Sequence, residues 1–234
     1  MTDSSDDQTP MEWILARFND WIDRRTRRRT PVTPVDAALF GQAPADETGA
    51  HLDLKGLTLR PPASLSVLAP ALVEAGLDDQ GDCIVRWSLA CNCGREAGGL
   101  LGHPLSGVAP ERVSQGDSDP LLSPLVFVCR ACNRETVFLD TNRHGYHAEI
   151  ARAEGGAGSA KLTGSGSPTP HSCPLCGKPD FAMVAVLAYW DLEEIGEAAL
   201  ELSLAPEDLF NTFELECECL SCQHRSQPTD FGKL

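Results

Sequence analysis

Apolar residues recur at steps of three and four between residues 10 and 29, which is the period of an amphipathic α-helix. The apolar positions are Met11, Ile14, Leu15, Phe18, Trp21 and Ile22. Thr9 and Pro10 supply an N-cap and a first-turn proline, and an arginine cluster, Arg24 to Arg29, ends the pattern. We predict one helix over residues 10–29.

Shorter patterns follow as far as residue 153. Leucines on either side of Lys55 and Gly56 predict a hairpin over 52–59, and residues 64–75 predict a short helix. Residues 83–89 alternate as a strand does, and the apolar stretches 125–128 and 136–139 predict two more strands. Residues 94–120 are rich in glycine and proline and are predicted to be a loop excursion.

The C-terminal part begins after a Gly- and Ser-rich stretch, residues 154–170, whose composition predicts a flexible linker. The apolar run 181–190 predicts a strand, since it has about half the ~20 residues that a membrane-spanning helix needs. Asp191 and Glu194 form a capping box before a helix over 192–202, and Pro206 starts a shorter one. Alternating apolar residues from Phe213 to Cys219 predict the last strand.

Cysteines carry the clearest chemistry, because eight of the ten form four close pairs. Two such pairs complete a tetrahedral Cys₄ site, so four pairs predict two structural zinc ions. The predicted ligands are Cys91, Cys93, Cys129 and Cys132 for the first ion, and Cys173, Cys176, Cys219 and Cys222 for the second. Iron is the alternative metal.

A disulfide framework is the alternative to metal. It requires an oxidising compartment, whereas the chain begins with acidic and polar residues and shows no export signal. Cysteines this close together are also poorly placed to bridge each other. We therefore expect a cytoplasmic protein with no membrane segment.

The segment Cys173-Pro174-Leu175-Cys176-Gly177-Lys178 resembles the C-P-x-C-G-K knuckle of the zinc-ribbon superfamily. The residue after the second cysteine of a knuckle commonly has positive φ, which suits Gly94, Asn133 and Gly177 better than Gln223. The pair Cys91 and Cys93 is one residue shorter than the family pattern. The resemblance implies β modules that bind zinc, but no single function.

The fold class is predicted to be α+β, with two zinc-ribbon-like modules. Residues 1–50 form the acidic tail, amphipathic helix and linker, 51–153 the first module, 154–171 the Gly/Ser-rich linker, and 172–234 the second module with an acidic helical insertion. The same order of pairs and insertions in both modules favours a tandem duplication. The alternative is a cross-paired arrangement, in which each metal takes ligands from both regions.

Two cysteines remain outside the four pairs. Cys217 could replace Cys219 as a ligand, because Cys217-Glu218-Cys219 has the spacing of Cys91-Asn92-Cys93. The other interpretation is that Cys83 and Cys217 are small buried apolar residues on strands.

His144 and His147 are the histidine pair with ligand-like spacing. With Glu149 or Asp140 they could hold a catalytic metal. Gly145 favours a turn over a helix here, so the alternative is a loop after the strand whose histidines bond locally or to solvent.

The charge of the chain narrows the range of functions that it could have. The net charge is −15, and residues 180–220 contain eleven acidic residues and no lysine or arginine. Such a surface repels phosphate backbones. We expect a non-catalytic zinc-binding protein that acts by protein–protein interaction or regulation, for which an immunity- or antitoxin-like factor is one version.

Two other functions remain open. One is nucleic-acid binding through the cluster Arg24–Arg29, with Arg130 and Arg134 on the first module. The other is a metal-dependent hydrolase that uses His144 and His147.

Overall fold

The computed structural model describes residues 60–78, 81–109, 119–155, 163–190 and 192–229, together with the backbone of three short strands at 33–34, 52–54 and 57–59. These residues belong to one unit, Val32–Gly232. The helix predicted over 10–29 and its arginine cluster lie outside the described residues.

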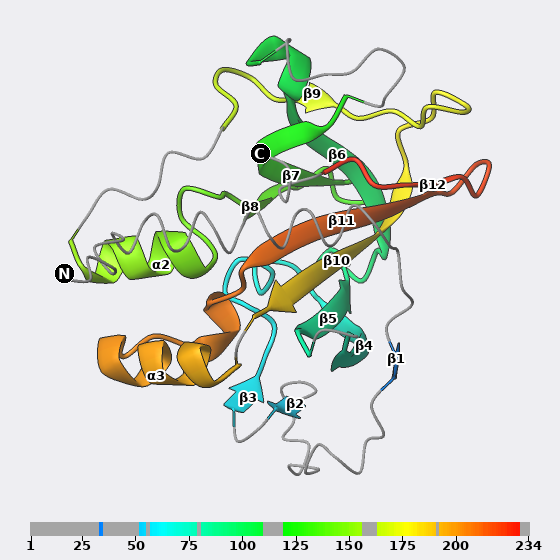
Figure 1. The fold of residues 1–234 in the computed structure, drawn as a ribbon. Helices are drawn as coiled ribbons and strands as arrows, with labels where there is room; N and C mark the ends of the chain where they lie inside the picture. The colour runs from blue at the N-terminus through cyan, green and yellow to red at the C-terminus, as the bar shows by residue number, and fades with distance from the viewer. Residues whose placement is uncertain are drawn as a thin grey trace, which may run out of the picture. The chain divides into compact units, whose positions relative to one another are not determined.

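Strands dominate the described part of the chain (Figure 1). The strands are β1 Thr33–Pro34, β2 Leu52–Leu54, β3 Leu57–Leu59, β4 Ala71–Leu77, β5 Cys83–Ser88, β6 Ala97–Pro104, β7 Leu121–Cys129, β8 Glu135–Leu139, β9 Thr169–Pro170, β10 Phe181–Tyr189, β11 Thr212–Cys219 and β12 Arg225–Ser226. The helices are α2 Tyr146–Ala153 and α3 Leu192–Leu202, with 3₁₀ turns η2 Leu105–Gly107 and η4 Pro206–Asp208. This content fits an α+β or mainly β protein.

Two long strands, β6 and β10, organise the main sheet. Strand β10 pairs with β11 along one edge, and with β5 and then β6 along the other. Strand β6 pairs with β7 along one edge, and with β9 and then β10 along the other. Strands β4, β8 and β12 extend the sheet beyond β5, β7 and β11. All of these pairings are antiparallel.

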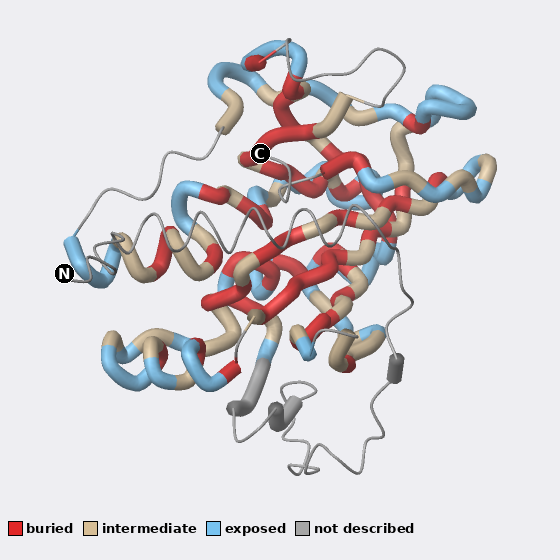
Figure 2. Tube along the Cα trace, viewed as in Figure 1, coloured by how far each residue is buried: buried red, intermediate tan, exposed pale blue. Residues whose placement is uncertain are grey.

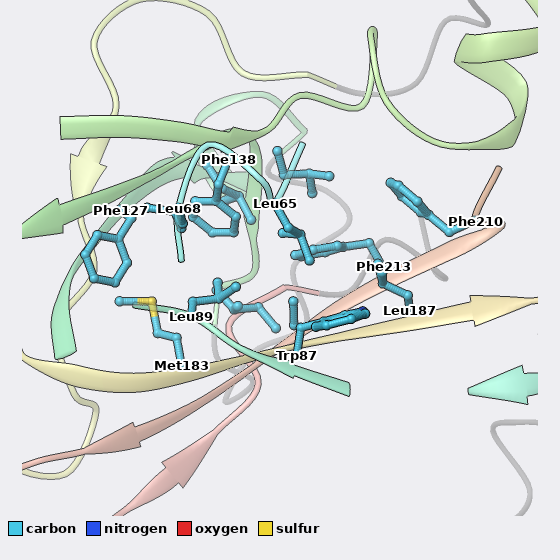
Figure 3. Close-up of a cluster of buried hydrophobic side chains, with 14 of the residues drawn as sticks. Leu65, Leu68, Trp87, Leu89, Phe127, Phe138, Met183, Leu187, Phe210 and Phe213 are labelled. Carbon is cyan, nitrogen blue, oxygen red and sulfur yellow. The ribbon is translucent and has the colours of Figure 1, made fainter. Parts of the chain in front are cut away.

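The first cysteine pairs and their strands, residues 60–155, are called the first region, and residues 163–229 the second region. One large apolar core contains side chains from both regions (Figures 2 and 3). Trp87 and Leu89 of the first region lie beside Met183 and Leu187 of the second (Figure 3). The rings of Phe138 in β8 and Phe213 in β11 have centroids 6.3 Å apart. Helix α3 adds Leu192, Ile195 and Ala199 to the same core. The two regions therefore share their hydrophobic interior.

Strand register repeats between the two regions. Gly98, five residues after Cys93, pairs with Cys129, and Phe181, five residues after Cys176, pairs with Cys219. The strands on either side of the second cysteine pair also match. In each region, the residue before the pair pairs with the residue three positions after it: Val128 with Glu135, and Glu218 with Arg225.

The pairing between the regions is reciprocal. Ser88, three residues before Cys91, pairs with Val184, eight residues after Cys176. Pro170, three residues before Cys173, pairs with Leu101, eight residues after Cys93. Each region thus sends the strand before its first cysteine into the sheet of the other region.

Most predicted elements are confirmed, including the hairpin over 52–59, the strands beside the cysteine pairs, and the helix over 192–202. The helix predicted over 64–75 is wrong, because residues 63–68 form turns and β4 follows. The loop predicted over 94–120 contains β6. The last two residues of the predicted linker 154–170 form β9.

Candidate metal centres

The structure gathers the eight paired cysteines into two groups of four. In the first centre the Sγ atoms of Cys91 and Cys132 are 3.6 Å apart, and those of Cys93 and Cys129 are 3.5 Å apart. All four sulfurs lie within 4.8 Å of one another. The knuckles that carry them follow β5 and β7.

The second centre repeats this arrangement between the knuckles that precede β10 and follow β11. Its sulfur distances are 3.6 Å for Cys173 and Cys222 and 3.5 Å for Cys176 and Cys219. In both centres these short distances join the first cysteine of one knuckle to the second cysteine of the other. The cross-paired arrangement, with ligands mixed between the regions, does not occur.

These distances fit a tetrahedral metal. A zinc–sulfur bond of about 2.3 Å places the corners of a regular tetrahedron about 3.8 Å apart. A disulfide would need about 2.05 Å, and all ten cysteines are free thiols. Each group could therefore hold one metal ion.

The knuckle backbone closes in the same way at three of the four turns. The N–H groups of Cys129, Cys173 and Cys219 donate to carbonyl oxygens five residues ahead, at 2.9 Å in each case. Cys91 donates to Arg95, four residues ahead, at 2.8 Å, so the shorter knuckle still closes.

The residue after each second cysteine has positive φ, as predicted. The values are 87° at Gly94, 55° at Asn133, 70° at Gly177 and 59° at Gln223. Gln223 therefore adopts the knuckle conformation although its side chain suits it poorly.

Backbone N–H groups favour the thiolate form of the first cysteine in the second knuckle of each centre. The N–H of Cys132, acting against burial and with help from that of Ala131, lowers the pKa of Cys129 to about 6. Burial raises the pKa of Cys219, but the N–H groups of Cys222 and Ser221 outweigh it and bring the pKa to about 7. Thiolates are the form that binds metal.

Each knuckle has one inner and one outer cysteine. The inner ones, Cys91, Cys129, Cys173 and Cys219, are at most 3% exposed and belong to the shared core. Cys93, Cys132 and Cys176 are exposed and Cys222 is partly exposed. Sequence reasoning missed this division, although the inner cysteine directly adjoins a strand in two of the four knuckles.

The two remaining cysteines lie outside both groups. Cys83 in β5 and Cys217 in β11 are at most 1% exposed and pack in the main core. Burial, together with the charges of Asp82 and Asp78, raises the pKa of Cys83 to about 12. The interpretation of both as buried apolar residues is confirmed, and Cys219, not Cys217, joins the second centre.

The histidine pair does not form a third centre in the described residues. Among them, the groups of three or more potential ligands are the two cysteine groups. The Nδ1 atom of His144 accepts a hydrogen bond from the N–H of Asp140 at 3.0 Å, and burial lowers the pKa of His144. The Glu149 carboxylate accepts from Arg152 at 2.9 Å. The loop predicted for both histidines is wrong for His147, because α2 begins at Tyr146, directly after Gly145, and places the His147 ring edge-on to that of Tyr146.

Three ion pairs lie near the centres. Arg130, on the second knuckle of the first centre, contacts Asp180 at 3.0 Å. Along β11, Glu216 contacts Arg86 at 2.7 Å and Glu218 contacts Arg225 at 2.8 Å. Arg130 is thus engaged by a carboxylate of the second region.

An ion bound by all four sulfurs of a group would have a complete tetrahedral shell, with no open position for a substrate. In the described part of the chain, no helix has both the length and the apolar character needed to cross a bilayer.

Comparison with known proteins gives no match to a protein-family model, a curated protein or a solved structure.

Proposed function

We propose that this chain is a cytoplasmic, non-catalytic protein that binds two structural zinc ions and acts through contacts with a protein partner. The observation that carries the proposal is the closed set of four sulfurs in each centre, spaced for a tetrahedral ion. A complete shell of thiolates holds a fold together and leaves no coordination site for chemistry.

The metal is zinc. Four thiolates suit zinc or iron, and zinc forms such sites without redox chemistry. Its binding energy, about 10–16 kcal/mol per structural site in small zinc domains, stabilises knuckles in which Cys93, Cys132 and Cys176 are exposed. The expected ligands are the eight paired cysteines.

Surface residues support a protein partner. Leu175 and Leu220, on the two knuckles of the second centre, are 69% and 48% exposed, and Leu200 on α3 is 84% exposed. The first turn of α3 contains Glu193 and Glu194, so this helix exposes acidic side chains as well as Leu200. This combination suits a partner with basic and apolar residues better than a phosphate backbone.

The two modules are copies of one unit. The support is the repeated register: within each region, the strands pair at equal offsets from equivalent cysteines. The diagonal sulfur distances also match between the centres. Cysteine spacing alone would not impose the same strand pairing.

Native mass spectrometry of the full chain, purified in reductant, tests the proposal. We expect the mass of the polypeptide plus two zinc ions, and elemental analysis that gives zinc and not iron. Substituting both outer cysteines of the first centre, Cys93→Ser with Cys132→Ser, should remove one ion. The same spectra report proteins that copurify with the chain.

Cys217→Ala is the matched control, because it also removes a thiol but outside both centres, and it should keep both ions. Cobalt(II)-loaded protein should show a visible spectrum of tetrahedral thiolate coordination that added azide leaves unchanged. Protein that is folded and metal-free in reductant contradicts the zinc assignment, and a spectrum altered by azide contradicts closed centres.

A further inference from the structure

The two candidate metal centres stand on a shared set of strands. Knuckle 91–95 of the first centre lies between β5 and β6, and knuckle 173–178 of the second lies between β9 and β10. These four strands are also the ones that pair across the two regions. Each centre is therefore held in place by strands that the other centre helps to position.

Backbone hydrogen bonds join the centres at equivalent points. The N–H of Leu89, two residues before Cys91, donates to the carbonyl of Met183 at 2.9 Å. The N–H of His171, two residues before Cys173, donates to the carbonyl of Leu100 at 2.8 Å. In both cases the acceptor lies seven residues after the last cysteine of the opposite first knuckle.

Packing joins the centres as well. The inner cysteine of every knuckle belongs to the same core cluster, along with Leu89 and Met183. Strands β6 and β10 also pair with each other directly: Gly98 pairs with Phe181, and Ala97 pairs with Ala182. A region whose knuckle is disordered would leave the strands of the other region without these partners.

We propose that the two metal centres are thermodynamically coupled through the exchanged strand pairs β5–β10 and β6–β9, so that an ion bound at either centre raises the affinity of the other. This rests on the proposed function, in which both centres bind zinc. The two states of each centre are a closed knuckle with its strands paired and an open knuckle with them frayed. An ion binds the closed state, and because strand pairing is shared, closing one knuckle favours closing the other.

Stepwise zinc addition to the metal-free full chain in reductant, followed by native mass spectrometry, tests the coupling. Two independent centres give about one half or more of the chains with a single ion at half saturation, whether or not their affinities are equal. For centres of equal affinity, a tenfold coupling lowers this fraction to about one quarter. A fraction equal to that of two independent centres with the affinities measured in the single-centre variants below overturns the proposal, whereas failure to bind any zinc overturns the proposed function instead.

Two centre-deficient variants provide a second measurement. Cys93→Ser with Cys132→Ser removes the first centre, and Cys176→Ser with Cys222→Ser removes the second, using outer cysteines in both cases. Coupling is reciprocal. In each variant, the zinc affinity of the remaining centre should be lower than the affinity of the same centre in the intact chain when the other ion is bound. The two centres should lose affinity by the same factor. Unchanged affinities overturn the proposal.

Substitution at residue 171 tests the route. His171→Pro removes the N–H that donates to Leu100 and leaves all eight ligands in place, and should raise the singly loaded fraction towards one half. His171→Ala keeps the N–H and is the matched control, because both variants lose the ring that lies 5.2 Å from that of Phe181; its fraction should be lower than that of His171→Pro. Equal singly loaded fractions in the two variants would show that the coupling does not pass through the strand pair β6–β9. If His171→Pro does not fold, the titration of the unaltered chain still decides whether coupling exists.

Discussion

At the scale of single residues, the knuckles depend on backbone conformation as much as on sulfur. The residue after each second cysteine has positive φ, a conformation that costs L-amino acids roughly 1–2 kcal/mol and glycine almost nothing. Two of the four positions are glycine, one is asparagine and one is glutamine. The backbone requirement is therefore met even where the side chain opposes it.

Gly177→Ala should destabilise the metal-loaded protein by about 1 kcal/mol. A Cβ at Gly177 would meet no atom within 4 Å, so the cost comes from its φ of 70° and not from a clash. The measurement is urea unfolding in reductant at fixed zinc concentration.

Gly107→Ala is the matched control for this change. A Cβ at Gly107 also meets no atom within 4 Å, and its φ lies outside the left-handed region. Its stability should stay within about 0.5 kcal/mol of the unaltered protein. Equal effects at the two glycines would contradict the role of positive φ in the knuckle.

Residue chemistry was the part of the site that sequence predicted best. The cysteine spacing identified the close pairs that make up both groups of four and left Cys83 outside them, because short loops between ligands are a local property. It left Cys217 and Cys219 as alternatives, since both lie in one alternating pattern. The choice depends on the register between β10 and β11. Phe181, at the start of β10 beside knuckle 173–178, pairs with Cys219 and not with Cys217.

At the scale of elements, strong alternation of apolar and polar residues predicted strands correctly. Weaker patterns failed where pairing with a neighbouring strand determines the secondary structure. Residues 71–77 have helix-compatible composition, yet they form β4 because β5 offers an apolar partner along their length. Tertiary pairing overrides such weak local preference.

Strand β6 was missed because of its glycines. A Cβ at Gly98 would lie 2.7 Å from the ring of Phe127 and 2.6 Å from the carbonyl oxygen of Val128. Glycine here allows close approach of two strands, whereas in the sequence alone it indicates a loop.

Leu187→Ala in β10 should destabilise the protein by about 2–5 kcal/mol. Leu187 is 0% exposed and lies between Val85 of β5 and Phe213 of β11, so its truncation leaves a cavity where the two regions meet (Figure 3). Denaturant unfolding with the metal content checked before each run measures the change.

The comparison for Leu187 is Val73→Ala in β4. Val73 is 57% exposed, so losing its methyl groups should change stability by no more than about 0.5 kcal/mol. A Leu187→Ala protein as stable as Val73→Ala would show that the shared core is not tightly packed.

At the scale of the whole molecule, the sequence indicated two modules and a linker, whereas the strand pairs show how the modules are combined. Strand exchange of this kind leaves no local signal, because β5 and β10 are distant in sequence and each would pair equally well within its own module. The division into segments 1–50, 51–153, 154–171 and 172–234 stays a prediction about composition and folding units.

Cutting the chain at a protease site inserted between residues 156 and 162 should leave one body. The fragments are held by β5–β10, β6–β9 and the shared core, so they should coelute at the mass of the uncut chain with two zinc ions. Size-exclusion chromatography with native mass spectrometry measures this.

The uncut chain with the same insertion is the control for the cut. Separation should require denaturant together with a chelator. Fragments that separate in native buffer, each with one ion, would instead support independently folding modules.

The exchanged strands also set the order of events on the ribosome. Strand β5 leaves the exit tunnel early and can pair with β4, but its other neighbour, β10, is synthesised nearly a hundred residues later. At roughly 5–20 residues per second, that delay lasts about 5–20 s. During this time the edge of β5 that pairs with β10 lacks its partner, while all four cysteines of the first centre emerge. The nascent chain must therefore keep an apolar strand from aggregating before its fold can close, which makes this interval the natural point for a chaperone to act.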